Sequence, residues 1–565
     1  MQVRDIDDSE PLRPYVPRLL IEWLREDPTV PFKEVEGTLA FVDISGFTKM
    51  CERLARKGKV GAEEVNDVLD ASFTQLLSIA YDDGGGVVKW GGDAVLLLYT
   101  GSHHAQRASR AAFRMRAKLR EIGGRLRTSA GLVSLRMSVG IHSGRFLFFL
   151  VGGLHRELVV TGPSATRTVL AESIATAGDV VLTPEAAALL DERFLGGRKG
   201  AGRLLRSAPT GFPHERSRPV DNTSDLDLAS CIPTHIRDYL LQGGGEAEHR
   251  HVAIAFIEFG GTDALLERSG PVALRDALDD LMRSVQEACH EHDVSFHETD
   301  ISKDGGKILL VAGAPKTSGH DEERMLRAVR AIMDRRYALT VRVGVNDGYV
   351  FAGNFGPPYR RAYSIKGDAV NLAARVMGKA AAGQVLATAS VLDRSRTEFE
   401  VKALDPFLVK GKKRPVLAYE VGAVQGLKAT GKRLELPFVG RDAELAALLE
   451  GLGAAREGSG RLFDVIGEPG IGKSRLLREL RDRATGFRVL SVACDPYESS
   501  TPYHPFRVVL REVVGLPADV DASTSGRLLD ERVRESAPQL LPWLPLLATL
   551  LDADVTPTPE SDRLE

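Results

Sequence analysis

Two aspartates early in the chain have neighbours that suit a metal site. Asp43 lies in the apolar run Thr38–Ile44, which predicts a strand, and Asp93 follows the glycine pair Gly91 and Gly92. Carboxylates at neighbouring strand ends can hold hard cations such as Mg²⁺, with phosphate oxygens completing the coordination. Small glycines let a polyphosphate approach the backbone. A lone aspartate in either setting would more simply cap a helix or end a turn, so the pairing favours a metal and phosphate site.

A second set of polar residues lies near the middle of the chain. Asn371 and Arg375 are four positions apart in a segment whose pattern predicts an amphipathic helix, so they share one helix face. Arginine suits a phosphoryl group because its planar guanidinium offers several donors and keeps its proton. The alternative is an arginine on a solvated helix face and an asparagine that acts as a weak cap.

The surroundings of the aspartates occur twice in the chain. FVDISGF around Asp43 aligns with FIEFG around Glu258, and KWGGDAV around Asp93 aligns with KDGGKIL around Lys307. The second copy therefore has Glu258 and Lys307 in place of the two aspartates.

The helical segment differs in the opposite sense. GDAVNLAAR in the second copy aligns with GPSATRTVL in the first, which places Thr166 opposite Asn371 and Leu170 opposite Arg375. Each copy thus lacks what the other keeps. A duplicated fold with complementary losses predicts one working site and one degenerate site at a pseudo-twofold interface.

A glycine-rich loop lies further along and matches the pattern GxxxxGK[ST]. Its residues are Gly467, Gly470, Gly472, Lys473 and Ser474. The apolar run 462–466 predicts a strand before it, and residues 475–480 predict a helix after it. In that context, backbone amides and a helix N-terminus cradle phosphates, the lysine meets their charge and the hydroxyl reaches Mg²⁺. No convincing acidic strand follows, so we expect a truncated ATPase module without hydrolysis.

The length of 565 residues predicts three or four domains. Helices are expected around 16–25, after residue 60 and over 105–122, and a hairpin over 87–99. The expected organisation is a helical lead-in over 1–36, a first repeat over 37–205, a linker over 206–250, a second repeat over 251–422 and a P-loop domain over 423–565.

Composition excludes several classes of protein. With 74 basic and 77 acidic residues the formal net charge is −3, which argues against a nucleic-acid partner. The four cysteines are scattered without metal-ligand spacing, as in a reducing compartment. The acidic N-terminus lacks a signal-peptide core, and no apolar run approaches the ~20 residues of a membrane helix. We expect a cytoplasmic protein.

The motifs FVDISGFTKM, KWGGDAVLLLY and YSIKGDAVNLAAR together resemble the class III nucleotidyl cyclase catalytic domain. With tandem copies, a lead-in and a downstream P-loop, the chain is most similar to the soluble, bicarbonate-responsive adenylyl cyclases. The resemblance implies an α/β (α+β) fold with two ferredoxin-like cyclase domains in a pseudo-twofold pair, followed by the start of a P-loop NTPase domain. In that family this module is a signal-transducing regulator of the cyclase.

The same resemblance implies roles for individual residues. Asp43 and Asp93 would bind two Mg²⁺ or Mn²⁺ ions with help from the Ile44 carbonyl, Asn371 would position the ribose, and Arg375 would stabilise charge at the α-phosphoryl group. Lys303 and Ser364 would contact the base and favour ATP, because guanylyl cyclases of the family tend to carry Glu and Cys there. Lys410 and Lys412 lie where the family often binds triphosphate, although a solvated basic turn is an equal alternative.

The degenerate site would combine residues of both copies, namely Lys89, Thr166, Leu170, Glu258 and Lys307. In the soluble cyclases the equivalent cavity binds bicarbonate through a Lys and an Arg. Lys89 matches that Lys, but Val169 stands at the position of the Arg. Bicarbonate or another small regulator is one interpretation, and a closed, packed site without a ligand is the other.

These features predict an adenylyl cyclase that converts ATP to 3′,5′-cyclic AMP and pyrophosphate at one site between the two copies. Two alternatives remain open. One is a guanylyl cyclase, and the other is a catalytically silent, nucleotide-gated regulatory or scaffold protein. The complete set of Asp43, Asp93, Asn371 and Arg375 argues against the silent protein.

Overall fold

The computed structural model of the chain forms two compact units, residues 1–428 and 429–565. The described residues are 11–46, 50, 53–54, 59–92, 94–123, 126–129, 131–217, 223, 225–245, 247–409, 415–427, 440–467, 472–492, 504–517, 520–551, 553–561 and 563. Each unit is described by itself.

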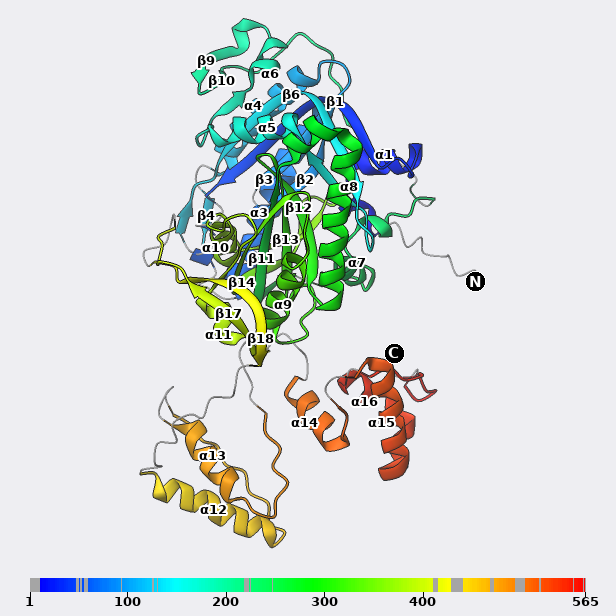
Figure 1. The fold of residues 1–565 in the computed structure, drawn as a ribbon, viewed down its shortest axis with the longest axis vertical. Coiled ribbons are helices and arrows are strands. Elements are labelled where there is room, and N and C mark those ends of the chain that lie inside the picture. The colour runs from blue at the N-terminus through cyan, green and yellow to red at the C-terminus, as the bar shows by residue number, and fades with distance from the viewer. Residues whose placement is uncertain are drawn as a thin grey trace. The chain divides into compact units, whose positions relative to one another are not determined.

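The first unit contains two eight-stranded sheets with the same topology. The first sheet has the order β2-β3-β1-β6-β8-β10-β9, with β7 on β6; the second has the order β12-β13-β11-β14-β16-β18-β17, with β15 on β14. This confirms a duplicated α/β fold (Figure 1). The strands of the first sheet are β1 Phe32–Ser45, β2 Gly85–Gly91, β3 Ala94–Thr100, β6 Arg136–Val151, β7 Glu157–Thr161, β8 Val180–Leu182, β9 Leu195–Lys199 and β10 Gly202–Leu205; those of the second are β11 Glu248–Gly260, β12 Ser295–Ser302, β13 Gly305–Ala312, β14 Thr340–Phe355, β15 Ala362–Lys366, β16 Val385–Thr388, β17 Thr397–Ala403 and β18 Ala418–Leu427.

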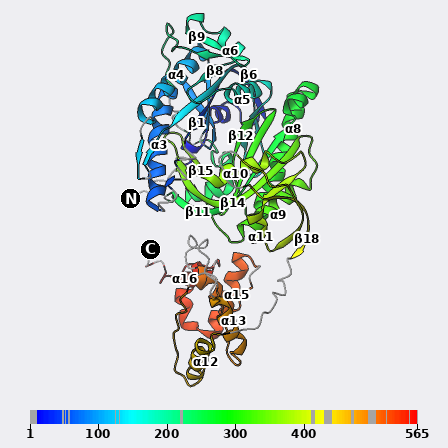
Figure 2. The same cartoon turned by 90° about the vertical axis from the view of Figure 1, so that its left-hand side faces the viewer.

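Long helices cover the outer face of each sheet. In Figure 2, α3 and α4 lie on one side of the tandem unit and α8 and α9 on the other, with the strands between them. The predicted helices after residue 60 and over 105–122 correspond to α3 and α4, and the N-terminal helix to α1. The helices of this unit are α1 Arg18–Glu26, α3 Lys59–Asp82, α4 His104–Gly123, α5 Pro163–Ser173, α6 Pro184–Ala188, α7 Thr234–Leu241, α8 Thr262–Glu291, α9 Asp321–Met333, α10 Asp368–Met377 and α11 Ala389–Arg394, with short 3₁₀ turns η1 Arg13–Tyr15, η2 Glu192–Phe194 and η3 Ala229–Cys231; a small separate pair is formed by β4 Leu126–Thr128 and β5 Gly131–Val133.

Alternation along the strands divides the apolar residues between cores. On β1, Ala40 packs beneath α3 and α4, whereas its neighbour Leu39 belongs to a core that both repeats share. The shared core also contains Ile254 of β11 and four buried residues of α1. Burial of apolar surface from both repeats and from the lead-in therefore holds the two repeats together.

The lead-in and the linker join this shared core. Trp23 of α1 is 1% exposed, and its indole Nε1–H donates to the Val30 carbonyl at 3.1 Å. Helix α7 of the linker buries Ile236 and Leu240 in the same core. The first sheet begins earlier than expected, because β1 already starts at Phe32 and pairs there with Phe149 of β6.

The described part of the second unit consists of helices. They are α12 Asp442–Arg456, α13 Lys473–Arg483, α14 His504–Val514, α15 Ala522–Ser536, the 3₁₀ segment η5 Pro538–Trp543 and α16 Leu544–Leu551. The prediction of a strand over 461–466 is wrong: residues 459–467 form no strand, and Leu462 is 98% exposed. A strand needs a partner for its backbone groups, and the described residues of this unit offer none.

Among the described residues, no helix is long and apolar enough to cross a membrane. The cytoplasmic location stays a prediction.

Candidate active site

Asp43 occupies the end of β1, where the register places it between Ala94 of β3 and Ser138 of β6. Its carboxylate is half-buried, and the next residue, Ile44, is fully buried. Asp93, which directly precedes Ala94 in the sequence, lies outside the described residues. The cross-strand neighbours of Asp43 are thus a methyl group and a hydroxyl, and neither neutralises the carboxylate.

The matching position in the second repeat is Glu258, which lies between Lys307 and Arg342. Arg342 donates from Nε to the Glu258 carboxylate at 2.6 Å. Two cations therefore stand where the first repeat has Ala94 and Ser138. A divalent cation is repelled by neighbouring positive charge. Lys307 and Arg342 place two cations beside Glu258, whereas Ala94 and Ser138 add no charge beside Asp43, so the first repeat suits Mg²⁺ or Mn²⁺ better than the second.

Asn371 and Arg375 both belong to α10, directly after β15 and the turn at Gly367. Both side chains are half-buried, and Asn371 donates from Nδ2 to the Gly367 carbonyl at 3.5 Å. Arg375 forms no hydrogen bond or ion pair with another described residue. A half-buried guanidinium with its donors unspent is available to an anionic ligand.

The corresponding helix of the first repeat, α5, has lost these groups. Leu170 is 42% exposed, and Thr166 accepts a hydrogen bond from the Asp304 backbone N–H at 2.9 Å. Asp304 is in the β12–β13 turn, so α5 contacts the hairpin of the other repeat. On the opposite side, Lys366 of β15 donates to the Gly92 carbonyl in the β2–β3 turn. Each hairpin turn therefore meets the helix region of the other repeat.

The strand registers correct the alignment around Lys303. Asp43 pairs with Ala94, and Glu258 pairs with Lys307, so Lys307 corresponds to Ala94 rather than to Asp93. The second hairpin is longer by two residues on each strand. Lys303 consequently lies in its exposed turn.

The same registers identify the true counterpart of Lys89 on β12. Lys89 pairs with Leu96 of β3, and Glu298 pairs with Leu309 of β13. Glu298 and Lys89 both line a cavity of about 100 Å³ between the two repeats. Glu298 is therefore the charged residue at the domain interface that the sequence alignment missed.

The environment of Glu298 brings the pKa of its carboxyl group close to neutral pH. Burial raises the pKa of Glu298 to about 7, and the Lys366 ammonium partly opposes that rise. Ser364, two residues before Lys366 on β15, is 2% exposed, and its hydroxyl has no hydrogen-bond partner in the described structure. An orphaned buried hydroxyl is a group that a bound ligand can satisfy.

Comparison with known proteins assigns the family. A model of the adenylate and guanylate cyclase catalytic domain matches residues 31–203 and 246–421, which together make up more than half of the chain. The chain belongs to this cyclase family. A model of the AAA ATPase domain matches residues 437–561, so an AAA-type ATPase domain follows the two cyclase domains.

The chain is similar to two named relatives and to one solved structure. Adenylate cyclase type 10 of Oryctolagus cuniculus is 24% identical over 560 residues, covering 89% of this chain and 34% of that protein. The Homo sapiens protein of the same name is 24% identical over 561 residues, covering 88% and 34%. The chain thus spans about a third of the length of these relatives. A class III adenylyl cyclase-like ATP-binding protein from Pseudomonas aeruginosa has a TM-score of 0.47 at 13% identity, covering 64% of this chain and 85% of that one.

Lys89, which the sequence predicts for the degenerate site, takes part in an internal ion pair. The Lys89 ammonium contacts the Glu157 carboxylate at 2.5 Å and the Thr299 hydroxyl at 2.7 Å. Both charged side chains are buried. Burial alone would raise the pKa of Glu157, but Lys89 and His155 lower it to about 2. Thr299 also donates to Glu157 at 2.6 Å, so this network joins the two cyclase domains.

Removing Glu157 should be costly, because Lys89 would remain as an uncompensated buried charge. We expect Glu157→Ala to lower the free energy of unfolding by about 3–5 kcal/mol in urea denaturation. The double variant Lys89→Met, Glu157→Leu should lose much less, since no charge is left behind. Because the folded pKa of Glu157 is depressed, its stabilisation is present above the ordinary carboxyl pKa and is lost as the pH falls towards about 2. Equal losses in both variants would contradict this account.

The P-loop of the ATPase domain is only partly described. Gly467 and Gly472 are described, Gly470 lies outside the described residues, and nothing is described of the Ser474 side chain. Helix α13 begins at Lys473, as the motif predicts, and the Lys473 ammonium donates to the Gly467 carbonyl at 2.6 Å. The lysine ammonium therefore lies next to the first glycine of the phosphate-binding motif.

Lys410 and Lys412 also lie outside the described residues. Of the remaining predicted site residues, Asp43 and Ile44 stand at the end of β1, and Asn371 and Arg375 stand on α10.

Proposed function

We propose that the two cyclase domains convert ATP to 3′,5′-cyclic AMP and pyrophosphate at a single site between them. The observation that carries this proposal is the opposite distribution of charge at matching positions. Asp43 has Ala94 and Ser138 as cross-strand neighbours, whereas Glu258 is held between two cations. ATP is supported as the substrate by relatives named adenylate cyclase type 10.

We assign the metal ions to the first cyclase domain. Asp43, Asp93 and the Ile44 carbonyl would hold two Mg²⁺ or Mn²⁺ ions. When bound, such ions acidify the attacking hydroxyl and neutralise phosphate charge. The reaction is attack of the ribose 3′-oxygen on the α-phosphorus, with loss of pyrophosphate. The carboxylates of Asp43 and Asp93 would determine where in the cyclase pair this attack takes place.

We assign orientation and charge stabilisation to the second cyclase domain. Asn371 would hold the ribose, and Arg375 would donate to the α-phosphoryl oxygens as negative charge develops there. Both are on α10, which is separated from β15 by a single residue, so the strand limits where the start of this helix can lie. Lys410 and Lys412 are the proposed triphosphate contacts.

We assign base contacts to Glu298 and Ser364. An ionised Glu298 accepts hydrogen bonds from guanine N1–H and its amine, whereas a protonated Glu298 can donate to adenine N1 and accept from the adenine amine. The buried hydroxyl of Ser364 can serve either base. The position of Glu298 therefore favours GTP as a second candidate substrate, and the raised pKa keeps ATP available near neutral pH.

The experiment that tests the cyclase assignment incubates the full chain with ATP or GTP plus Mg²⁺ or Mn²⁺ and identifies the product by mass. Cyclic nucleotide from neither substrate would refute the assignment and favour a silent, nucleotide-binding protein.

Arg375→Ala should lower kcat by about 10²–10³-fold, because one preorganised donor to a developing oxyanion is worth about 3–4 kcal/mol. KM should change much less. The matched control is Leu170→Ala at the equivalent position of α5, which should keep kcat within about twofold. Similar losses in both variants would mean that the helix is needed for the fold rather than for transition-state contacts.

We further propose that the degenerate site is closed to bicarbonate. Lys89 already has a carboxylate partner in Glu157, and Val169 supplies no second cation. Nucleotide binding at the P-loop is a separate proposal, supported by the position of Lys473 over Gly467.

A further inference from the structure

A cavity of about 600 Å³ lies in the tandem unit away from the hairpin turns that flank the active site. Its walls come from the lead-in, the C-terminal end of α3, the linker at Arg216–Ser217 and the loop 358–360 that precedes β15. Tyr81 and Asp82 of α3 come just before β2, at the end opposite to Gly91. The length of β2 separates the two ends by about 20 Å.

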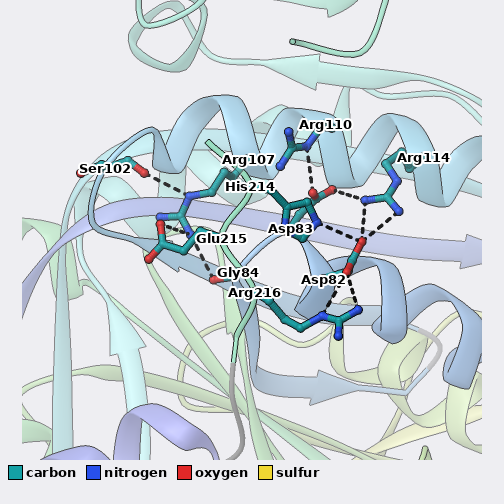
Figure 3. A network of polar contacts seen from close by, with 10 residues as sticks. All are labelled: Asp82, Asp83, Gly84, Ser102, Arg107, Arg110, Arg114, His214, Glu215 and Arg216. Atoms are coloured by element: carbon teal, nitrogen blue, oxygen red, sulfur yellow. Dashed lines mark hydrogen bonds and ion pairs between the residues drawn. The ribbon is translucent and has the colours of Figure 1, made fainter. Parts of the chain in front are cut away.

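The cavity is lined by cations. Four arginines, Arg13, Arg18, Arg216 and Arg360, line it together with one acidic residue, Asp82. Figure 3 shows Asp82 between Arg216 and Arg114, with contacts of 2.8 and 3.1 Å. The carboxylate is therefore already neutralised by two guanidinium groups.

The same network of ion pairs holds the part of the linker that lines the cavity. His214 and Arg216 both contact Asp82, at 3.4 and 2.8 Å, and Arg110 contacts Asp83 at 2.8 Å (Figure 3). Asp82, Asp83 and His214 are close enough to share a cation. The arginines already supply the positive charge, so these ion pairs attach the linker to α3 and do not form a metal site.

Arg360 is the buried cation of the cavity. It is 4% exposed, and its Nη1 donates to the carbonyls of Pro14 and Tyr15, each at 3.2 Å, and of Arg361 at 2.7 Å. Its Nε–H has no hydrogen-bond partner in the described structure. Burial lowers the pKa of Arg360 to about 10. Its hydrogen-bond partners are neutral carbonyls, and the remaining stabilisation is electrostatic, from Tyr81 and from Glu298, which shares the smaller cavity of about 100 Å³ with Arg360. A buried cation without a hydrogen-bonded carboxylate is costly.

Two aromatic rings line the cavity beside this cation. Tyr81 and Tyr359 meet edge to face with centroids 5.1 Å apart, and Tyr359 is 43% exposed. Ile21 and Val16 of the lead-in complete an apolar wall. A concave site with aromatic walls and one convergent charge is the usual form of a small-molecule site.

We propose that this cavity binds a small organic anion with an aromatic body. The anionic group, a carboxylate, phosphate or sulfonate, faces Arg360, and the ring packs on Tyr81 and Tyr359. Because the walls belong to the lead-in, the linker and both cyclase domains, the ligand contacts all four segments at once. The proposal does not depend on the cyclase reaction.

The test uses two fluorescent probes of similar shape on the full chain. One is 1-anilinonaphthalene-8-sulfonate, and the other is N-phenyl-1-naphthylamine, which lacks the sulfonate. We expect the wild-type chain to have about one sulfonate-probe site that Arg360→Gln weakens about tenfold or more, since hydrogen bonds to charged groups are worth at least that. Binding of the uncharged probe should change little in that variant.

A second variant fills the space without touching the cation. Ser78 is an exposed residue of α3 on the cavity wall, so Ser78→Trp should remove the same site for both probes. Arg145→Gln is the matched control, because Arg145 is a 74% exposed arginine on β6, away from the cavity. Unchanged sulfonate binding in Ser78→Trp, or equal binding in Arg360→Gln and wild type, overturns the proposal. If Arg360→Gln fails to fold, Ser78→Trp alone decides.

Discussion

Asp43→Asn is expected to lower kcat for cyclic nucleotide formation by about 100-fold or more while the fold is retained. Asparagine keeps the volume of the side chain but removes the charge that holds a divalent cation. A 100-fold loss corresponds to about 2.7 kcal/mol of transition-state stabilisation, which is modest for a metal ligand. The measurement is initial velocity at saturating Mn²⁺, with circular dichroism and thermal unfolding as checks on the fold.

Glu258→Gln is the matched control for this variant. Glu258 has the same place in the second cyclase domain, but it pairs with Arg342, whose side chain is 35% exposed and can be hydrated when the carboxylate is removed. We expect activity within about twofold of wild type. A loss confined to Glu258→Gln would mean that the working and degenerate sites were assigned to the wrong halves of the pair, and equal losses in both variants would mean that the loss does not report on the metal site.

The fold could be predicted where the sequence pattern is local. The amphipathic helices, the glycine hairpin and the duplicated strand motifs all have short-range signals, and the structure confirms α3, α4, the β2–β3 hairpin and the duplicated sheet. The start of β1 at Phe32 was missed because its pairing with Phe149 is a contact between residues distant in sequence. The strand expected at 461–466 was wrong for the same reason: four of its six residues are apolar, but pairing depends on partners elsewhere.

The site divides along the same line. The charge of Asp43 and the helical spacing of Asn371 and Arg375 follow from the sequence. The residue of the second repeat that corresponds to Lys89 depends instead on the length of the hairpin. The second hairpin is two residues longer on each strand, so the glycine pairs of the two motifs do not correspond, and the strand registers place Glu298 rather than Lys303 at the position of Lys89. The signal available in the sequence was the run of polar residues ahead of the turn, His297, Glu298 and Thr299, which places a carboxylate on β12.

The degenerate site shows a further limit. Lys89 is a visible charge, but its partner Glu157 comes from β7 and the hydroxyl of Thr299 from the other domain. Neither motif spacing nor composition joins these three segments. An isolated lysine in the sequence therefore indicated a ligand site, whereas the folded chain supplies the counter-charge itself.

The second large effect is expected from Glu298→Lys, which should raise the ratio of kcat/KM for ATP over GTP by about 100-fold or more. A lysine ammonium can donate to adenine N1 but opposes the N1–H donor of guanine, and sites built to pair polar groups discriminate strongly against the mismatched base. Lys303→Glu is the matched control, because Lys303 is exposed in the β12–β13 turn. It should leave the ratio unchanged, and a large effect there would return the base contact to Lys303.

The pH dependence of the wild-type chain tests the same residue without changing its size. Glu298 has a pKa raised to about 7, so it is protonated below that pH and ionised above it. The protonated acid matches adenine and the carboxylate matches guanine, so the GTP to ATP ratio of kcat/KM should rise as the pH increases from about 6 to 8. In Glu298→Gln, a neutral amide replaces the acid at every pH, and the ratio should become flat. A flat ratio in the wild-type chain, or an unchanged slope in Glu298→Gln, would show that base selection does not depend on this carboxyl group.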